Sequence, residues 1–229
     1  MHTKSEIVNW LGIHHGYSSY LEVASANSGF QFSNIDTRIF SSIERIMYRL
    51  PPDYHDGLKI NFSTTSTDSC LCFMLLIDKK KSFDVVFIDS YHTYEASRRD
   101  LELALLVLDK KGTLVVHGCN PSAVIYTLRQ SMNGQWVGET YLAFLNFVNE
   151  KDCIDYCVLD MDWGCGVIRW KNDEIADKYK ASIVSGTYTN RCDATIRAPY
   201  YDWSYFNEHH THLLKLKSVV EFKKLHVAS

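Results

Sequence analysis

The sequence predicts an α/β fold in which a mostly parallel, seven-stranded sheet lies between two layers of helices and ends in an antiparallel hairpin. Short apolar runs alternate with longer segments of helical spacing, which is the pattern of repeated βα units. The last two runs are close enough in sequence to pair directly. We expect this three-layer α/β/α sandwich to form one domain across residues 1–229, a length that suits a single well-buried core.

The first third of the chain supplies three of the strands. A helix around residues 6–11 precedes the first strand, and another helix follows that strand from about Phe32. Pro51 and Pro52 break the chain between the second and third strands. The three predicted strands are "SYLEVAS", "TRIFSSI" and "LKINFST", at residues 19–25, 37–43 and 58–64.

The middle of the chain has the clearest pattern. The run "FDVVFIDS", residues 83–90, predicts a central strand because it is rich in Val, Ile and Phe and has one charge in its first six residues. Apolar residues recur at helical spacing from Tyr94 to Leu108, and Gly112 marks the end of that helical pattern. "TLVVHG", residues 113–118, predicts the next strand.

The last third of the chain supplies the hairpin and most of the remaining helices. An amphipathic helix is expected from Trp136 to Val148. Asp162-Trp163-Gly164 predicts the hairpin turn between two strands, "DYCVLDM" and "GCGVIRW", at residues 155–161 and 164–170. Residues 171–204 are poorly patterned and are expected to form an irregular segment that covers the site, with at most one short helix. A C-terminal helix follows at residues 205–226.

Composition and charge narrow the function classes. The formal net charge of −3 provides no basic surface for a polyanion, so we expect a small-molecule or glycan partner and no nucleic acid. No apolar run is long enough to span a membrane. Seven cysteines, none in a Cys-x-x-Cys pair, predict reduced thiols. The first residues show no apolar secretory region and no run could span a membrane, so we expect a cytoplasmic protein. A homo-oligomer is left open.

Polar side chains follow the two strongest strands. Asp89 and His92 come at the end of the strand at residues 83–90, and His117 and Asn120 come at the end of the next. In parallel sheets ligands bind just beyond the carboxyl ends of the strands. The sequence therefore predicts an active site that contains these four residues.

The order and spacing of four motifs resemble those of a known family. The motifs are "YLEV", "FDVVFIDSYHTYE", "VVHGCNP" and "LDMDWGCGVI", which begin at Tyr20, Phe83, Val115 and Leu159. Together they resemble the class I S-adenosylmethionine-dependent methyltransferases, in particular the small branch found beside polysaccharide and glycan genes (methyltransferase family 24-like). The resemblance spans nearly the whole chain and implies a Rossmann-like fold with S-adenosylmethionine as cofactor.

The resemblance also implies a cofactor loop after the first strand. Ala24 and Ala26 stand where the family has glycines, a small change in volume provided that neither position needs a positive φ. An acid that binds ribose is expected near Ser42, where Glu44 is the nearest carboxylate. The implied cofactor-binding residues are Glu22, Ala24, Ala26, Gly29, Asp68 and Asp89. For Asp68, a helix N-cap is an equally good interpretation.

As the resemblance implies, the site would transfer a methyl group to a hydroxyl, which needs a base. His92 is the predicted base because imidazole titrates in the useful range, and Asp89 would orient His92 or the acceptor. His117 and Asn120 complete the predicted catalytic set. A histidine that only packs at a strand end is the alternative for His92.

Some relatives bind Mg²⁺ through carboxylates in these two loops. In this chain Gly118 stands where the second carboxylate is expected, so Asp89 and Asn120 would make a poor Mg²⁺ site. We therefore expect no metal, with Asp89 as a weak candidate whose site substrate oxygens would have to complete. The histidines of two other groups are expected on solvated helix faces: His14, His15, His209, His210 and His212.

The acceptor is expected to be a sugar or another small-molecule hydroxyl. Tyr91 and Trp136 are the predicted acceptor contacts, since an aromatic ring can stack on a sugar; Trp136 is equally well interpreted as a core residue. The alternative to an enzyme is a catalytically inactive methyltransferase-like binding module. The changes at Ala24, Ala26 and Gly118, and the missing acid near Ser42, motivate that alternative.

Overall fold

A computed structural model describes residues 2–24, 34–47, 69–89, 91–128, 136–182 and 202–227. The strands are β1 (Ser19–Ala24), β2 (Ser42–Met47), β3 (Phe83–Asp89), β4 (Leu108–His117), β5 (Ile154–Leu159) and β6 (Cys165–Trp170). The helices are α1 (Lys4–His15), α2 (Cys70–Asp78), α3 (Tyr94–Val107), the short 3-10 helix η3 (Val124–Thr127), α4 (Thr140–Glu150), α5 (Asp173–Ser182), α6 (Trp203–Leu213) and α7 (Val219–Val227). Among the described residues, no helix has the length and apolar character needed to cross a membrane.

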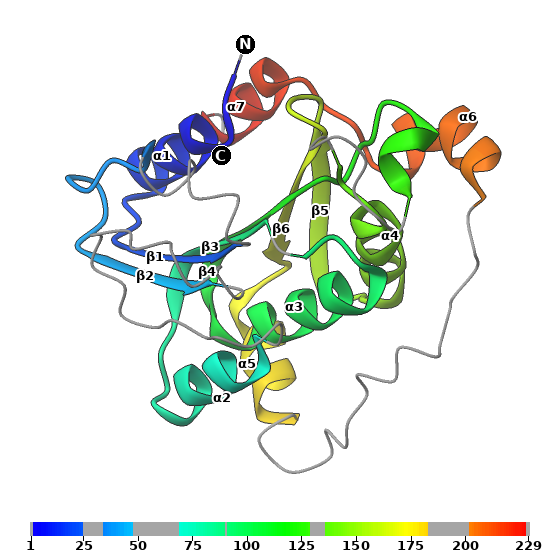
Figure 1. The fold of residues 1–229 in the computed structure, drawn as a ribbon. Helices are drawn as coiled ribbons and strands as arrows, with labels where there is room; N and C mark the ends of the chain where they lie inside the picture. The colour runs from blue at the N-terminus through cyan, green and yellow to red at the C-terminus, as the bar shows by residue number, and fades with distance from the viewer. Residues whose placement is uncertain are drawn as a thin grey trace, which may run out of the picture.

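The sheet confirms the predicted α/β architecture. Its six described strands lie in the order β2-β1-β3-β4-β6-β5, with β1 to β4 parallel and β6 antiparallel to both of its neighbours. Helices cover both faces, which gives three layers (Figure 1). The predicted third strand at residues 58–64 lies outside the described residues. The strand order otherwise reproduces a mostly parallel sheet that ends in an antiparallel hairpin.

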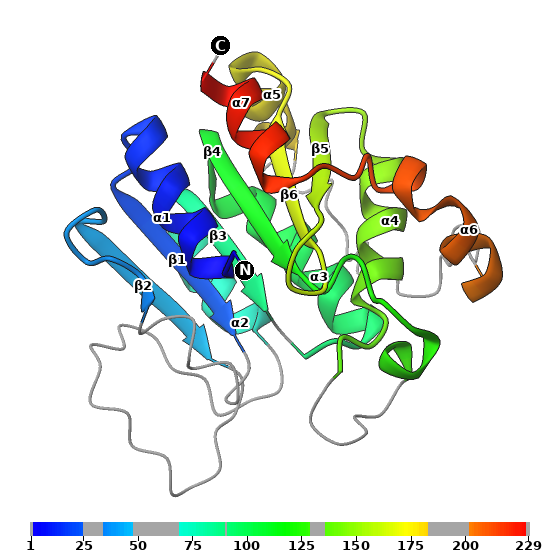
Figure 2. The same cartoon turned by 90° about the horizontal axis from the view of Figure 1, so that it is seen from above.

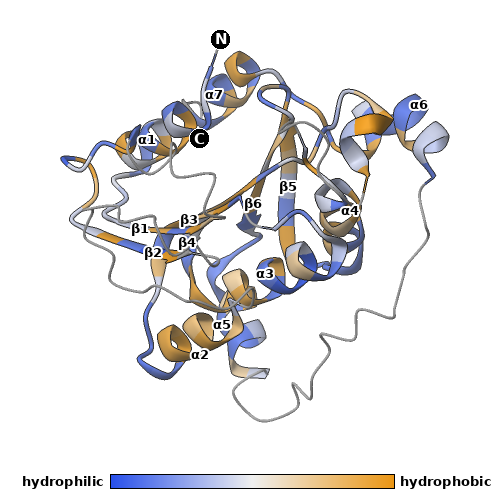
Figure 3. Cartoon of the chain, viewed as in Figure 1, coloured by the Kyte–Doolittle hydropathy of each residue, from blue (hydrophilic) through white to orange (hydrophobic). Residues whose placement is uncertain are grey.

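Each face of the sheet has its own apolar core because successive strand residues point to opposite sides. Val85 and Phe87 of β3 pack with α1 and α7, while Val86 and Ile88 pack with the helices of the other layer. Figure 2 shows α1 and α7 over the same face of the sheet. Helix α2 is the most continuously apolar helix in Figure 3, and it buries Phe73 in the opposite core.

The predicted second strand at residues 37–43 is misplaced, since β2 begins only at Ser42. The Asp36 carboxylate accepts hydrogen bonds from the Arg38 backbone and guanidinium, which fixes a turn where the strand was expected. Residues 34–41 also contain no α-helix, so the helix predicted from about Phe32 does not reach into this described segment. The true strand carries Glu44 and Arg45, charges that made it look unlike a buried strand.

The single C-terminal helix predicted at residues 205–226 is also wrong. It is two helices, because residues 214–217 leave the helix and pair with the edge strand β5. The Val158 N–H donates to Leu214 O at 3.0 Å, and the Lys217 N–H donates to Val158 O at 2.9 Å. A smaller difference is that α4 begins at Thr140 rather than Trp136. Helix α5 is a short helix at the start of the segment predicted to be irregular, which that prediction allowed.

Candidate active site

The carboxyl ends of β1, β3 and β4 meet at one edge of the sheet. Ala24, the last residue of β1, is in register with Asp89, the last residue of β3. His117 ends the neighbouring strand β4. The parallel register therefore brings together side chains that are far apart in sequence, as predicted for Asp89 and His117.

Asp89 is the centre of this group. Its side chain is buried, and its Oδ1 atom lies 2.9 Å from His117 Nδ1 and 3.5 Å from His92 Nε2. Its Oδ2 atom accepts a hydrogen bond from Lys4 Nζ at 3.0 Å. Burial raises the pKa of the Asp89 carboxyl, but the positive charges around it outweigh burial and hold this pKa well below its usual range. Asp89 is therefore ionised at neutral pH.

His92 is held by its backbone. Its φ of +51° is in the left-handed region, which a non-glycine residue adopts only when its surroundings enforce it. The Glu139 N–H donates to His92 O at 2.9 Å. Gly138 lies against the same carbonyl, so closely that a Cβ on Gly138 would be 2.0 Å from His92 O. The loop before α4 thus fixes where the imidazole points.

The ring of His92 is a neutral base at neutral pH. Burial lowers the pKa of His92 to about 4, although the negative charge of Asp89 acts in the opposite direction. His92 Nδ1 lies 3.0 Å from Thr140 Oγ1, which in turn lies 3.1 Å from Ser97 Oγ. These hydroxyls position the ring and leave Nε2 on the side of Asp89.

His117 connects this group to the hairpin turn. Its Nε2 donates to the backbone carbonyl of Asp162 at 2.9 Å. Asp162, Trp163 and Gly164 all have positive φ values, of 39°, 64° and 82°. Two consecutive non-glycine residues in this region indicate strain that the rest of the structure maintains. The predicted turn is therefore confirmed, and Asp162 is a site residue that sequence reasoning had treated only as part of the turn.

Lys4 is a second site residue that sequence reasoning missed. Thr3 forms a capping box with Glu6, so α1 begins at Lys4 and directs this side chain from the first helical turn. Lys4 Nζ lies 3.0 Å from Asp89 Oδ2 and 3.8 Å from Asp162 Oδ2. Burial lowers the pKa of Lys4, but these two carboxylates raise it by more. No local motif marks Lys4, because its partner is 85 residues away.

The other predicted catalytic and acceptor residues lie around this centre. The Asn120 N–H donates to Trp163 O at 2.7 Å, so Asn120 belongs to the turn rather than to the contacts of Asp89. Trp136 donates from Nε1 to Leu128 O, and its ring packs edge-on against His92 with centroids 5.5 Å apart. Tyr91 is exposed in the connection between β3 and α3.

The predicted cofactor residues are only partly described. Ala24 is buried at the end of β1, whereas Ala26, Gly29 and Asp68 lie outside the described residues. The Glu22 carboxylate accepts from Tyr20 Oη at 2.9 Å and lies 3.2 Å from Arg45 Nη2, and burial raises its pKa to about 7.

The ribose-binding acid was expected near Ser42, but Ser42 lies at the wrong end of its strand. Ser42 begins β2, and the carboxyl end of this strand is at Met47. Glu44, the nearest carboxylate, is buried and lies 2.9 Å from Lys81 Nζ. Glu44 is therefore away from the cofactor edge because it lies near the start of β2. The residues after Met47 lie outside the described part of the chain.

The residues at the centre do not fit Mg²⁺. Asp89, His92 and His117 have donor atoms within 4.8 Å of one another, but Mg²⁺ prefers oxygen ligands to imidazole. An aspartate at position 118 would be strained, because Gly118 has a φ of +84° and a Cβ there would lie 3.2 Å from Val137. Lys4 already provides a positive charge at Asp89.

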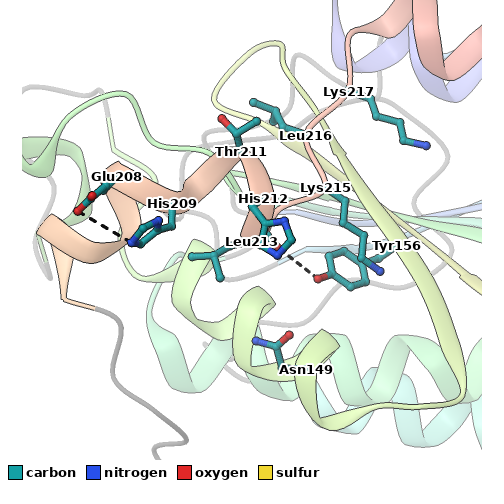
Figure 4. Close-up of a pocket in the computed structure, with 10 residues that line it drawn as sticks. All are labelled: Asn149, Tyr156, Glu208, His209, Thr211, His212, Leu213, Lys215, Leu216 and Lys217. Atoms are coloured by element: carbon teal, nitrogen blue, oxygen red, sulfur yellow. Dashed lines mark hydrogen bonds and ion pairs between the residues drawn. The ribbon is translucent and has the colours of Figure 1, made fainter.

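A cavity of about 500 Å³ opens beside the hairpin turn. Its lining residues are Asn120, Pro121, Ser122, Asp160, Met161, Asp162, Trp163, Gly164, Phe206, Asn207 and His210. A second cavity, of about 690 Å³, lies where α4, β5 and the residues after α6 meet (Figure 4). There Lys215 Nζ stands 4.1 Å from the centre of the Tyr156 ring, and no residue of the Asp89 group contributes to the lining. Only the first cavity adjoins the Asp89 group.

Comparisons with known proteins concern the domain class and the fold. Residues 10–119 match the model of a family described as a methyltransferase domain, a span that includes Asp89, His92 and His117. The structure resembles an O-methyltransferase from Bacillus cereus in complex with SAH, with 13% identity, a TM-score of 0.52 and coverage of 74% of this chain and 83% of that one. No curated protein matches the sequence.

A second solved structure shows the same likeness. It is a predicted caffeoyl-CoA O-methyltransferase from Staphylococcus aureus, with 13% identity, a TM-score of 0.51 and coverage of 74% of this chain and 84% of that one. At this level of identity the likeness shows the fold alone. The chain therefore shares the α/β fold of these two solved structures, and its residues 10–119 match a methyltransferase domain.

Proposed function

We propose that the chain is an S-adenosylmethionine-dependent O-methyltransferase that acts on a sugar or another small-molecule hydroxyl, with His92 as general base. The observation that carries this proposal is the neutral, buried imidazole of His92, fixed beside ionised Asp89 at the carboxyl edge of the sheet. The methyltransferase-domain match and the shared fold support the same reaction class. The Bacillus cereus structure holds SAH, the demethylated form of the cofactor.

The charges at this edge suit the cofactor. S-adenosylmethionine supplies an electrophilic methyl carbon on a positively charged sulfur. The carboxylates of Asp89 and Asp162 lie at this edge beside Lys4, and a sulfonium nearby would be attracted to them. Small Ala24 ends β1 in register with Asp89, so no bulky side chain at this strand end blocks close approach.

The roles of the protein groups follow from their contacts. Bound S-adenosylmethionine would supply the methyl group and leave as S-adenosylhomocysteine, and His92 Nε2 would accept the proton of the acceptor hydroxyl. Asp89, 3.5 Å from Nε2, stabilises the imidazolium that forms. Thr140 holds Nδ1 and prevents the ring from turning away. Lys4 keeps Asp89 ionised and fixed throughout.

One observation favours the alternative, an inactive binding module. Glu22, the acid of the cofactor motif, has both carboxylate oxygens engaged inside the protein by Tyr20 and Arg45. A carboxylate that serves the core in this way is less available to a cofactor. Cofactor binding is therefore the first property to measure.

The experiment is calorimetric titration of S-adenosylmethionine and S-adenosylhomocysteine into the full chain, with and without Mg²⁺. Binding of both, without dependence on Mg²⁺, is the expected result. Silence in every titration would support the inactive module.

The base is tested by formation of S-adenosylhomocysteine with a panel of sugar acceptors. His92→Gln should bind the cofactor normally and lose at least about 100-fold in turnover, the usual contribution of a general base. His212→Gln, which changes an exposed histidine on α6, is the matched control and should keep full turnover. Full turnover in His92→Gln would remove His92 from the role of base.

A further inference from the structure

The cavity beside the hairpin turn has the mixture of side chains that binds a polyhydroxylated ring. Asp160 and Asp162 offer carboxylate acceptors, while Asn120 and Asn207 offer amides that both donate and accept. Trp163 adds an indole, which can contact the apolar face of a ring. A volume of about 500 Å³ also falls within the range of small-molecule sites.

The charge of the cavity selects among acceptors. Of the described residues that line it, two are aspartates and none is lysine or arginine. Phosphate groups bind where Arg, Lys or helix N-termini face them, and two carboxylates repel them. A neutral acceptor therefore fits this cavity better than a sugar phosphate or a coenzyme A thioester. This distinguishes the chain from the Staphylococcus aureus relative, which is described by its caffeoyl-CoA substrate.

The turn that forms one wall of the cavity is held in an unusual conformation. Gly164 packs so closely on Asn120 that a Cβ at position 164 would lie 2.4 Å from the Asn120 backbone nitrogen. The Asn120 N–H bonds to Trp163 O at 2.7 Å, and the Trp163 ring meets Tyr126 at a centroid distance of 4.4 Å. These contacts hold Trp163 in one place beside the cavity, which is what a recognition surface requires.

The cavity shares one residue, Asp162, with the proposed catalytic group. Asp162 lines the cavity, and its Oδ2 lies 3.8 Å from Lys4 Nζ. The carbonyl of the same residue accepts from His117 Nε2. A ring bound against Asp162 would therefore have a hydroxyl on the side of Lys4 and Asp89.

We infer that this cavity is the acceptor site and that it takes a neutral sugar residue, bound by Asp160, Asn207 and Trp163. The inference rests on the proposed function for the reaction, but the sugar site itself is defined by the cavity. Sugar binding can therefore be tested without turnover.

The test follows the indole N–H signal of Trp163 by NMR in the full chain. The absence of one signal in Trp163→Phe assigns it among the five tryptophans of the chain. The probes are methyl glycosides of neutral hexoses, deoxyhexoses and pentoses, with glucose 6-phosphate and coenzyme A as charged counterparts. At least one neutral glycoside should shift the signal to saturation, and neither charged probe should do so.

Variants locate the contacts. Asp160→Asn should raise the dissociation constant of the bound glycoside about tenfold, the effect of weakening a hydrogen bond to a charged group. Asp155→Asn removes another exposed carboxylate, on strand β5 of the same hairpin, and should leave the constant unchanged. Equal effects of the two variants would overturn the assignment of Asp160.

The outcomes separate the two proposals. Tighter binding of coenzyme A or glucose 6-phosphate than of every glycoside, or no shift with any glycoside, overturns the sugar site while normal S-adenosylhomocysteine binding leaves the enzyme proposal standing. Saturable glycoside binding without any cofactor binding confirms the sugar site and removes the methyltransferase activity.

Discussion

Helix α1 contributes to two groups of histidines that differ in one respect. At its first residue, Lys4 contacts Asp89, around which His92 and His117 gather. At its last turn, His14 and His15 pack with His226 of α7, where His14 Nε2 lies 3.1 Å from His226 O. The first group has a carboxylate at its centre. The second has aromatic rings instead, including Trp10 stacked on His14.

The comparison shows that a low histidine pKa has more than one meaning. Burial lowers the pKa of His92 to about 4 against the attraction of Asp89. Burial also lowers the pKa of His15 to about 4, but there Arg169, His14 and His226 add to the effect. Asp89 offsets part of the cost of a proton on His92, which burial, His117 and Lys4 oppose, whereas every group that acts on His15 adds to the cost. His15 was expected on a solvated helix face; the structure instead stacks it on Tyr17.

The largest expected effect comes from removing the carboxylate that distinguishes the first group. Asp89→Asn leaves Lys4 without its closest partner and should lower the free energy of unfolding by about 3 kcal/mol, the cost of breaking a buried ion pair. Urea denaturation measures this change. Lys4→Met combined with Asp89→Asn should recover part of the loss, as a double-mutant cycle would show. His226→Phe, in the second group, should cost less than about 1 kcal/mol.

A second test changes the backbone support of His92. Gly138→Ala should lower the free energy of unfolding by about 2–4 kcal/mol, because the φ of +52° is strained for alanine and its Cβ would overlap His92 O. Gly16→Ala is the matched control at the end of α1, with a φ of +67° but nothing within 4 Å of the new Cβ. It should cost about 1 kcal/mol. Equal costs would mean that Gly138 does not hold His92.

The pH dependence of stability should reveal the second group. The unfolded chain takes up a proton on His15 near its ordinary pKa of about 6.5, whereas the folded chain does so only near 4. Stability therefore falls as the pH drops from 6.5 towards 4, by about 1 kcal/mol for His15 after allowance for its partial exposure.

His15→Phe should reduce the dependence between pH 7 and 5, measured by urea denaturation at each pH, and His212→Phe should not. It should not abolish the dependence, because burial also lowers the pKa of His92 to about 4 and His92 therefore contributes in the same pH window. The lowered pKa of Asp89 affects stability in a different pH range. Its contribution to the free energy of unfolding is complete above the unfolded pKa of about 4 and is lost only as the pH falls below that value. An unchanged slope in His15→Phe would show that this group does not resist protonation.

A further test concerns the hydroxyl that orients His92. Thr140→Val keeps the shape and removes the partner of Nδ1, so kcat should fall about tenfold with an unchanged acceptor KM. Thr113→Val is the control on the side of the second group, where Thr113 Oγ1 lies 3.1 Å from Tyr17 Oη. It should leave kcat unchanged. A rise in KM alone would contradict an orienting role for Thr140.

The parts of the fold that were predictable are those with a clear apolar run or a clear repeat of apolar residues. The strand β3 and the helix α3 follow directly from an apolar run and a 3.6-residue repeat. Strand β2 was misplaced because it carries two buried charged residues. Arg45 pairs with Glu22 and Glu44 pairs with Lys81, and both partners lie outside β2. The break between α6 and α7 depends on backbone pairing with β5. Side-chain patterns in the sequence do not reveal such pairing.

The site divides in the same way. Asp89, His92 and His117 were predictable because strand ends in a parallel sheet meet at one edge. Lys4 and Thr140 were not, since each reaches the centre from a separate element and no local motif marks its role. Asp162 lies in a quoted motif, but the sequence indicated only its place in the hairpin turn. Asn120 was grouped with Asp89 by sequence, yet its backbone bonds it to the turn.

The pairing of residues 214–217 with β5 also has a consequence for association between molecules. A sheet edge with unpaired backbone groups can extend into the sheet of a second molecule, which is a common route to aggregation. Here Leu214 O and the Lys217 N–H occupy backbone groups of Val158 at that edge. Lys215 and Lys217 add charge alongside. This short segment therefore covers the C-terminal part of the β5 edge, which is then closed to pairing with a second molecule.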